Sequence, residues 1–389
     1  MFSYNRVILI VMDGVGCGFQ PDYRKYNKRK SNTLGSVFEK YKDYNLPNLG
    51  ALGFNHILFG SNVQKNCAVG KMQEITAGND TRAGVWEMFG IVRKKRYRSI
   101  KKSFSKRLIK KISNNINSNV VGNEYISGFK ALDKFYNEHK KTNNPILYIS
   151  DDGVVLLAAH EGIINPERLN EMGSILADTL VGENISRVIT RPFTGSSSNF
   201  IRTINRNDFL CDKNINDSQL IKAAEKGILK IKTTEHLSKI LAQNNFINFK
   251  KGNFNNQEAF SLIRSELKTT GPSNEFQFYC LQDFDMCGHK KDIECLSQKL
   301  SELDKEIPFI LNEIKDNDLL IITADHGCDP INIERGHTRE FVPLIIYSKQ
   351  LKSGFSLGTR STFADIGQTI CSIFKLPKLS IGSPIYEVI

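Results

Sequence analysis

The stretch LLIITADHGCDP, Leu319–Pro330, changes abruptly from apolar to polar chemistry. Five residues suited to a buried strand, Leu319–Thr323, are followed almost at once by Asp325 and His326. A carboxylate and an imidazole at a strand end are typical of open α/β sheets, which bind ligands beyond the carboxyl ends of their strands. A single Asp-His pair often does no more than cap a helix, so this stretch indicates a site only if the chain offers it partners.

Two other apolar runs, Val7–Met12 and Phe276–Gln282, are also followed by carboxylates, and the second of them by a histidine as well. A further histidine lies eleven residues after His326. The candidate metal ligands are therefore three carboxylates and three imidazoles: Asp13, Asp285, His289, Asp325, His326 and His337. Six such ligands suffice for two divalent ions, which in two-metal sites lie roughly 4 Å apart and hold a phosphoryl group for in-line displacement.

Strand-type apolar runs alternate with helix-type segments, which predicts an α/β fold with a mostly parallel sheet and helices on both faces. Within Arg93–Lys111, eleven of nineteen residues are Lys or Arg and none is acidic. This shift in composition marks a domain boundary. We expect a metal-binding catalytic core domain of residues 1–94 and 210–389, with a smaller α+β cap domain of residues 95–209 inserted into it.

The chain of 389 residues carries a formal charge of +12, which suits an anionic partner. A nucleic acid would be one such partner, but the sequence has no zinc-finger, RNP or helix-turn-helix motif, and phosphorylated metabolites explain local arginines equally well. Apolar residues recur at near-helical spacing in the basic stretch Arg93–Lys111, which favours the solvated face of an amphipathic helix there. These observations argue against a nucleic-acid partner and leave the oligomeric state open.

The eight cysteines form no CxxC pair and have no regular spacing, which predicts neither a disulfide framework nor a zinc ribbon. We therefore expect a reducing, cytoplasmic setting. The apolar run near the N-terminus, Val7–Met12, is too short for a signal sequence or a membrane span. We accordingly expect a soluble protein without a membrane partner.

The segment Thr76–Met88, TAGNDTRAGVWEM, contains a turn and N-cap signal at Gly78–Asp80 followed by residues of a short helix. Thr81 would then begin that helix, where free backbone N–H groups and the helix dipole favour a phosphate on its hydroxyl. Most threonines in such a position serve only as caps. The six candidate metal ligands favour a nucleophile instead, because divalent ions activate an otherwise weak hydroxyl.

Inside the expected cap, a strand at Pro145–Ile149 is followed by Ser150 and Asp152. The cap also carries four arginines at or after strand ends: Arg187, Arg191, Arg202 and Arg206. Guanidinium groups could hold the phosphate of a sugar phosphate, and a carboxylate its hydroxyls. The alternative for any one of these arginines is an exposed side chain without a specific role.

Several motifs, taken in order along the whole chain, resemble those of bacterial phosphopentomutases, which belong to the alkaline phosphatase superfamily. They are MDGVG, GNDT before GVWE, SDDGVVLLAAHEG, RVITRPF, NFIRTINR, DFDMCGH, ITADHGCDP, HTRE and TFADIGQTI. ADHG with HT marks the superfamily alone, whereas the RVITRPF, NFIRT and AAHE motifs of the cap point to this family. The resemblance implies an alkaline-phosphatase-like fold and the interconversion of ribose or deoxyribose 1-phosphate and 5-phosphate in nucleoside salvage.

By this resemblance, Thr81 is the phosphorylated nucleophile and bridges two Mn²⁺ ions. One ion would be held by Asp13, Asp325 and His326, and the other by Asp285, His289 and His337. The resemblance also implies contacts to the pentose phosphate from four residues of the cap: Ser150, Asp152, Arg187 and Arg202.

The sequence departs from the usual family pattern KDTxTGHWE around the nucleophile at Asn79, Ala83 and Val85. DFDMCGH is also one residue shorter than the usual motif and leaves Asp285 and His289 four residues apart. Asp283 would be the substitute ligand if that loop were rearranged. Cys328 replaces the usual Asn after ADHG, and we expect it to take no part in the site.

Two alternatives to a phosphopentomutase follow from the same residues. One is a metal-dependent phosphatase, or an enzyme like phosphoglycerate mutase that acts on three-carbon acids. A carboxylate in the cap argues for a sugar, because Asp152 would repel an acidic substrate. The other is a degenerate, non-catalytic relative that binds nucleic acid through residues 93–111, against which the presence of Thr81 and all six ligands argues.

Overall fold

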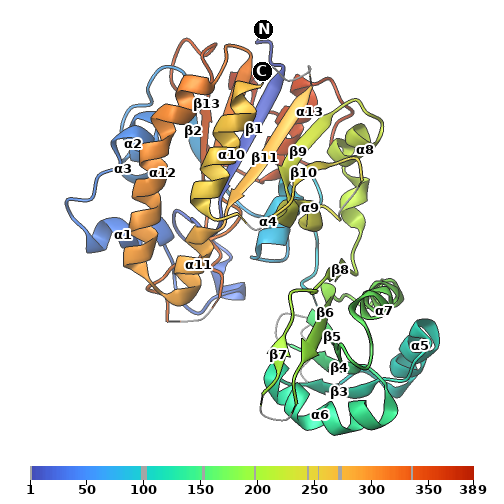
Figure 1. The fold of residues 1–389 in the computed structure, drawn as a ribbon. Coiled ribbons are helices and arrows are strands. Elements are labelled where there is room, and N and C mark those ends of the chain that lie inside the picture. The colour runs from blue at the N-terminus through green and yellow to red at the C-terminus, as the bar shows by residue number, and fades with distance from the viewer. Residues whose placement is uncertain are drawn as a thin grey trace. The chain divides into compact units, whose positions relative to one another are not determined.

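The computed structural model describes residues 2–97, 103–150, 154–196, 199–242, 245–252, 254–269, 274–333 and 336–389. The chain divides into two compact units (Figure 1). Residues Met1–Lys94 and Ile215–Ile389 form the first, here called the core unit. Residues Lys95–Asn214 form the second, here called the inserted unit.

The strands of the core unit are β1 (Arg6–Met12), β2 (Cys67–Met72), β9 (Lys230–Thr234), β10 (Asn248–Lys250), β11 (Glu275–Leu281), β12 (Asp318–Thr323), β13 (Val342–Tyr347) and β14 (Phe355–Arg360). Its helices are α1 (Thr33–Lys40), α2 (Pro47–Leu52), α3 (Phe54–Phe59), α4 (Thr81–Met88), α8 (Gln219–Glu225), α9 (Glu235–Ile240), α10 (Asn256–Lys268), α11 (Asp283–Lys290), α12 (Ile293–Glu313) and α13 (Ala364–Ile373). Short 3-10 turns cover Tyr23–Lys25, Asn214–Asp217 and Tyr386–Val388.

The eight strands form one sheet in the order β10-β9-β11-β1-β12-β13-β2-β14. All neighbouring strands are parallel except at β13, which runs antiparallel to both β12 and β2. Helices α10 and α12 lie on one face of the sheet and α4 and α13 on the other (Figure 1). The expected α/β fold with a mostly parallel sheet and helices on both faces is confirmed.

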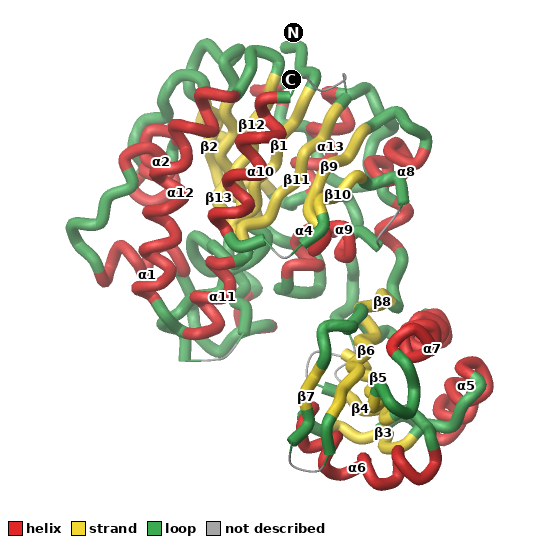
Figure 2. Tube along the Cα trace, in the orientation of Figure 1, coloured by secondary structure: helices red, strands yellow, loops and turns green. Residues whose placement is uncertain are grey.

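The three central strands β11, β1 and β12 are buried along their whole length, which explains their continuous apolar sequences. Met12 lies beside Leu281 and Val11 beside Thr323 in the parallel register. The residues after these three strands therefore emerge together at one edge of the sheet. Figure 2 shows α4 and α11 at this same edge.

The inserted unit contains α5 (Lys106–Ile116), α6 (Gly128–Thr142) and α7 (Pro166–Thr179) and the strands β3 (Val121–Tyr125), β4 (Ile146–Ile149), β5 (Val154–His160), β6 (Arg187–Thr194), β7 (Ile201–Arg202) and β8 (Asp208–Leu210). Its sheet has the order β3-β4-β5-β6-β7, with β8 also paired to β6. Successive side chains of β4 point to opposite faces of this sheet. Ile146 and Tyr148 pack with α6 on one face, and Leu147 and Ile149 pack with α5 and α7 on the other.

Two expectations need correction, and a third is incomplete. DFDMCGH, expected as a loop after a strand, forms helix α11, so Asp285 and His289 lie one helical turn apart. The helix of the basic stretch begins only at Lys106, and residues 98–102 within that stretch lie outside the described part of the chain. The cysteine spacing predicted no disulfide framework, and the structure contains a single pair among the described residues, between Cys287 of α11 and Cys295 of α12, which the sequence analysis did not anticipate. Irregular cysteine spacing could not reveal this pair because the turn between two helices brings it together.

No helix among the described residues is both long and apolar enough to cross a membrane.

One buried ion pair ties the beginning of β1 to the beginning of β12. The Arg6 guanidinium donates to both carboxylate oxygens of Asp318, at 2.9 and 2.6 Å. It also donates to the carbonyl oxygens of Glu266, Leu267 and Thr269 at the end of α10. Arg6 and Asp318 are each 3% exposed, so loss of either partner would leave the other as an uncompensated buried charge.

We therefore predict that Arg6→Ala lowers the free energy of unfolding of the core unit by about 3–5 kcal/mol. Lys239→Ala is the matched control, because it breaks the partly exposed ion pair with Glu235 on α9 and should cost below about 0.5 kcal/mol. Urea denaturation followed by circular dichroism measures both. Equal effects of the two substitutions would contradict the prediction.

Candidate metal centre

Asp13, Asp325 and His326 form the first of two groups at the carboxyl edge of the core sheet. The His326 Nε2 atom lies 3.2 Å from Asp13 Oδ1 and 3.6 Å from Asp325 Oδ2. All three residues are buried, and the Gly14 N–H donates to Asp325 Oδ1 at 3.1 Å. Neighbouring parallel strands β1 and β12 bring the two carboxylates together here.

Asp285, His289 and His337 form the second group. Both histidines approach the carboxylate through Nε2, His289 at 3.2 Å and His337 at 3.5 Å. Their Nε2 atoms lie 3.0 Å apart. Asp285 and His289 face the same direction because they are four residues apart on α11, while His337 comes from the loop that follows β12.

The two groups are continuous. The rings of His326 and His337 lie 4.1 Å apart between centroids, and ligand atoms of Asp285, His326 and His337 all lie within 4.8 Å of one another. The structure thus gathers all six residues singled out in the sequence. Asp283 lies outside the cluster, because its carboxylate accepts from the Asn256 N–H and pairs with a lysine of α12.

The chemistry of the cluster fits divalent cations. The Oδ2 atom of Asp325 and the Oδ1 atom of Asp285 are buried and accept no hydrogen bond from any described residue. Burial and the nearby Asp13 raise the pKa of Asp325 to about 8. Burial opposes the charged form of His326, but Asp325 and Asp13 outweigh it and raise the pKa of that imidazole. Carboxylate oxygens without donors, crowded by like charge, are the groups that a cation stabilises.

Thr81 is the first residue of α4 and lies against the first group. Its hydroxyl donates to Asp13 Oδ1 at 3.4 Å and lies 3.2 Å from His326 Nε2. Asp80 caps the helix by accepting from the N–H groups of Arg82 and Ala83. The free end of a helix dipole and a hydroxyl therefore face the same cluster of ligands.

Gly84 allows α4 to lie close to the metal-ligand loop. A Cβ atom at this position would lie 2.1 Å from the Asp325 carbonyl oxygen and 2.9 Å from the Asp325 Cα atom. Any larger residue must push the helix away from the strand end. The close approach of Thr81 to Asp13 thus depends on this glycine.

Two buried groups that sequence reasoning missed hold the nucleophile segment. Arg339 pairs with Glu74 at 2.6 Å and donates to the carbonyl oxygens of Thr76 and Gly78, so the chain after His337 is fastened to the chain before Thr81. The second group is the carboxylate of Glu87 in α4. Arg339 belongs to the HTRE motif and Glu87 to the GVWE motif, so both lie in motifs visible in the sequence.

Glu87, at the other end of α4, accepts hydrogen bonds from the N–H groups of Ile75, Thr76 and Phe363 and from the hydroxyl of Thr362. This single buried carboxylate joins three segments of the core unit. Two of the departures from the family pattern, Asn79 and Val85, have a clear place in the structure. Asn79 donates to the His337 carbonyl oxygen at 2.9 Å, and the Val85 side chain is fully buried.

The residues expected to contact a sugar phosphate lie in the inserted unit. Arg187 pairs with Asp208 at 3.1 Å, and Arg206 makes two hydrogen bonds to the same carboxylate. Burial opposes ionisation of Asp208, but Arg206 and Arg187 outweigh it and lower its pKa. The Arg202 guanidinium lies 4.4 Å from the centre of the Phe129 ring.

Ser150 follows β4 in this unit, whereas Asp152 lies outside the described residues. Burial, together with the like charges of Arg206 and Arg202, lowers the pKa of Arg191. Arg191, Arg202 and Arg206, three of the arginines named in the sequence, thus lie close enough together for their like charges to interact.

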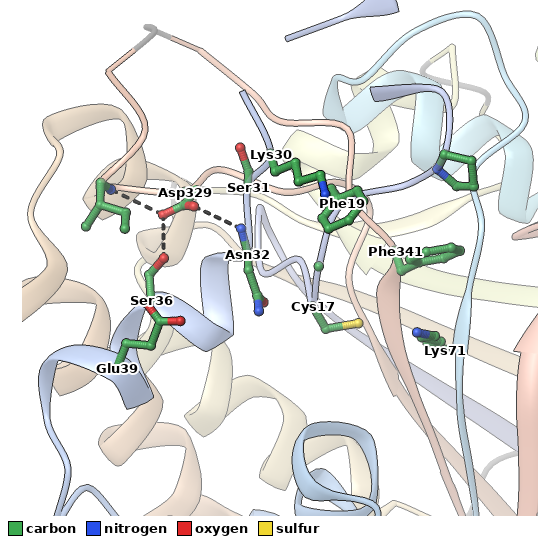
Figure 3. A pocket seen from close by; sticks show the side chains of 13 residues that line it. Cys17, Phe19, Lys30, Ser31, Asn32, Ser36, Glu39, Lys71, Asp329 and Phe341 are labelled. Carbon is green, nitrogen blue, oxygen red and sulfur yellow. Dashed lines mark hydrogen bonds between the residues drawn. The ribbon is translucent and has the colours of Figure 1, made fainter. Parts of the chain in front are cut away.

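A cavity of about 700 Å³ in the core unit is lined by residues that include none of the six candidate metal ligands (Figure 3). Asp329, next in the chain after Cys328, forms part of its wall. Its carboxylate accepts from the Ser36 hydroxyl and from the N–H groups of Asn32 and Ile331, the bonds drawn in Figure 3. These contacts fasten the loop after β12 to the start of α1.

Comparison with known proteins agrees with this geometry. A protein-family model described as Metalloenzyme superfamily matches residues 5–378. A phosphopentomutase of Acetivibrio thermocellus is 38% identical over 374 residues, which cover 94% of this chain and 94% of that protein. Phosphopentomutases of Caldanaerobacter subterraneus subsp. tengcongensis and Carboxydothermus hydrogenoformans are 38% and 37% identical, over 97% and 95% of this chain and 96% of each protein. The matched regions include the inserted unit, and this chain therefore belongs to the phosphopentomutase family.

Proposed function

We propose that this chain interconverts ribose or deoxyribose 1-phosphate and 5-phosphate in nucleoside salvage, with Thr81 as the residue that carries the phosphoryl group. The observation that supports this most is the position of the Thr81 hydroxyl. It lies at a helix N-terminus and within 3.4 Å of both Asp13 Oδ1 and His326 Nε2. Family membership supports the same activity.

Two divalent ions, most simply Mn²⁺, complete the proposed site. Asp13, Asp325 and His326 would hold one ion, and Asp285, His289 and His337 the other. Such ions supply Lewis-acid stabilisation of the charge that develops on a transferred phosphoryl group. The mixed oxygen and nitrogen donors of the cluster, and its buried carboxylate oxygens without donors, support this assignment.

The reaction would consist of two phosphoryl transfers and would begin with Thr81 phosphorylated. In the first, the P–O bond to Thr81 Oγ1 breaks while the free hydroxyl of the pentose phosphate forms a new P–O bond, and the proton of that hydroxyl ends on Thr81. The product is a pentose 1,5-bisphosphate. In the second, the bond between the sugar oxygen and the other phosphoryl group breaks as that group passes to Thr81 Oγ1. The Thr81 proton goes to the sugar oxygen, and the isomeric monophosphate is released. The positive end of the α4 dipole, where Thr81 lies, would stabilise the charge on the oxygens of the transferred group.

We propose that the inserted unit binds the pentose phosphate through Ser150, Asp152, Arg187 and Arg202. The grouped arginines around Asp208 support a phosphate ligand, because guanidinium groups match the geometry of phosphate oxygens. Arg187 and Arg202 would bind the phosphate, and Asp152 the sugar hydroxyls.

We predict that the purified enzyme with Mn²⁺ converts ribose 1-phosphate to ribose 5-phosphate without releasing phosphate. Thr81→Ala should lower this turnover by about a thousandfold or more, because the phosphoryl carrier is lost. Thr81→Ser keeps a hydroxyl and should retain measurable turnover. A coupled assay for ribose 5-phosphate, with free phosphate followed in the same tube, measures both. Phosphate release without isomerisation would identify a phosphatase, and full mutase activity of Thr81→Ala would exclude this mechanism.

A second prediction concerns the spacing between α4 and the metal-ligand loop. Gly84→Ala should lower kcat by about a hundredfold while the protein stays folded, because the added methyl group displaces Thr81 from the cluster. Gly162→Ala is the control, since its methyl group would meet only the His160 ring, at 3.2 Å. Steady-state kinetics with a thermal melt of each variant provide the measurement. Unchanged kcat in Gly84→Ala would show that this close approach is not required.

A third prediction distinguishes the two neighbouring carboxylates of α11. Chelation should abolish activity, and added Mn²⁺ should restore it with two ions bound per chain. Asp285→Asn should lose one of the two ions, whereas Asp283→Asn should keep both, because Asp283 is bonded outside the cluster. The number of ions bound per chain, measured by atomic emission after gel filtration, distinguishes the two variants. Loss of an ion from Asp283→Asn alone would reverse the assignment.

A further inference from the structure

Cys328 lies within the metal cluster, although the sequence suggested no part for it there. Its Sγ atom, a carboxylate oxygen of Asp285 and a ring nitrogen of His289 all lie within 4.8 Å of one another. The cysteine is 2% exposed. These three atoms come from two segments, the loop after β12 and helix α11, and together they form a donor set of one sulfur, one oxygen and one nitrogen.

The loop around Cys328 is held on several sides, and the Cys328 Sγ atom lies 3.9 Å from the backbone carbonyl oxygen of Asp285. The Cys328 N–H donates to the Thr33 hydroxyl at 3.2 Å, and the preceding Gly327 is paired with Thr338. The next residue, Asp329, is held by three hydrogen bonds in the wall of the cavity (Figure 3). Backbone and neighbours therefore hold the Cys328 side chain in this loop beside α11.

Helix α11 packs closely against the Cys328 side chain because it has a glycine at the point of contact. A Cβ atom on Gly288, one residue before His289, would lie 2.5 Å from Cys328 Sγ and 2.3 Å from the Cys328 carbonyl oxygen. Glycine at this position thus lets the cysteine pack directly on the turn of the helix that carries Asp285 and His289. The Oδ1 atom of Asp285 is buried in the same cluster, 3.5 Å from His337 Nε2, and adds an oxygen donor beside the sulfur.

We propose that Cys328 is a further ligand of the ion bound by Asp285 and His289, and that it lets this position bind softer ions more tightly than Mn²⁺. On binding, the thiol releases its proton to solvent and the sulfur lone pair forms a bond to the metal. Thiolate sulfur favours ions such as Zn²⁺, Co²⁺ and Cd²⁺. The candidate group of Asp13, Asp325 and His326 has oxygen and nitrogen ligand atoms, and the Cys280 thiol beside it is hydrogen-bonded to Asp13 Oδ2 at 3.3 Å. The inference rests on the two-metal site of the proposed function and gives its two positions different preferences.

Cobalt(II) is a suitable probe, because a cobalt–thiolate bond gives a charge-transfer absorption in the near-ultraviolet that nitrogen and oxygen ligands do not. The full-length enzyme is stripped with a chelator and titrated with Co²⁺ alone, without thiol reductant. We expect this band in the wild type and its loss in Cys328→Ser. Cys371→Ser is the matched control, because it removes another buried free thiol, on α13, and should keep the band.

A competition between Cd²⁺ and Mn²⁺ gives a second readout. Cys328→Ser should weaken Cd²⁺ binding by about tenfold or more and weaken Mn²⁺ binding much less. If circular dichroism shows that Cys328→Ser fails to fold, Cys328→Ala replaces it with the same expectations. A wild type that binds Co²⁺ without the charge-transfer band, or a band that survives in the Cys328 variant, would overturn this inference alone. A wild type that binds no Co²⁺ would contradict the proposed metal site as well.

Discussion

The structure depends on the crowding of three carboxylates at the carboxyl edge of an apolar sheet. Parallel pairing of β1 with β12 brings Asp13 and Asp325 together, and α11 adds Asp285 directly after the neighbouring strand β11. Burial and like charge raise the pKa of Asp325 to about 8, which shows how unfavourable the arrangement is without compensating positive charge. Histidines, divalent ions and the positive end of a helix are three ways to provide that charge. The proposed chemistry uses all three around one hydroxyl, that of Thr81.

Buried polar groups away from the cluster keep the segments of this site in register. Arg339 fastens the chain after His337 to the chain before Thr81, and Glu87 ties the far end of α4 to two further segments. Glu340 accepts from both the N–H and the hydroxyl of Thr33, and burial raises its pKa to about 7. Removing one partner from such a contact leaves a buried group unsatisfied, which costs more than the bond itself contributes. The site is therefore preorganised by residues that touch no ligand.

The sequence could predict those elements that follow from a local pattern of apolar and polar residues. The apolar runs before Asp13 and Asp325 defined two central strands, because buried parallel strands need apolar residues on both faces. It could not predict helix α11, whose first turn is fixed by reciprocal hydrogen bonds between Asp283 and Asn256, 27 residues earlier. The disulfide between Cys287 and Cys295 and the position of Cys328 beside α11 also follow from tertiary contacts. The spacing of residues in a sequence contains no information on such contacts. For this reason Cys328 was expected to take no part in the site, although it lies among the candidate metal ligands.

The central claim is that Thr81 itself carries the phosphoryl group. Peptide mapping by mass spectrometry, after the enzyme is incubated with a pentose 1,5-bisphosphate and quenched in acid, tests this most directly. We predict a single added phosphoryl group on the peptide that contains Thr81, with fragment ions that place it on this residue. A phosphoryl group on any other residue, or an enzyme that isomerises ribose 1-phosphate while this peptide stays unmodified, would contradict the claim.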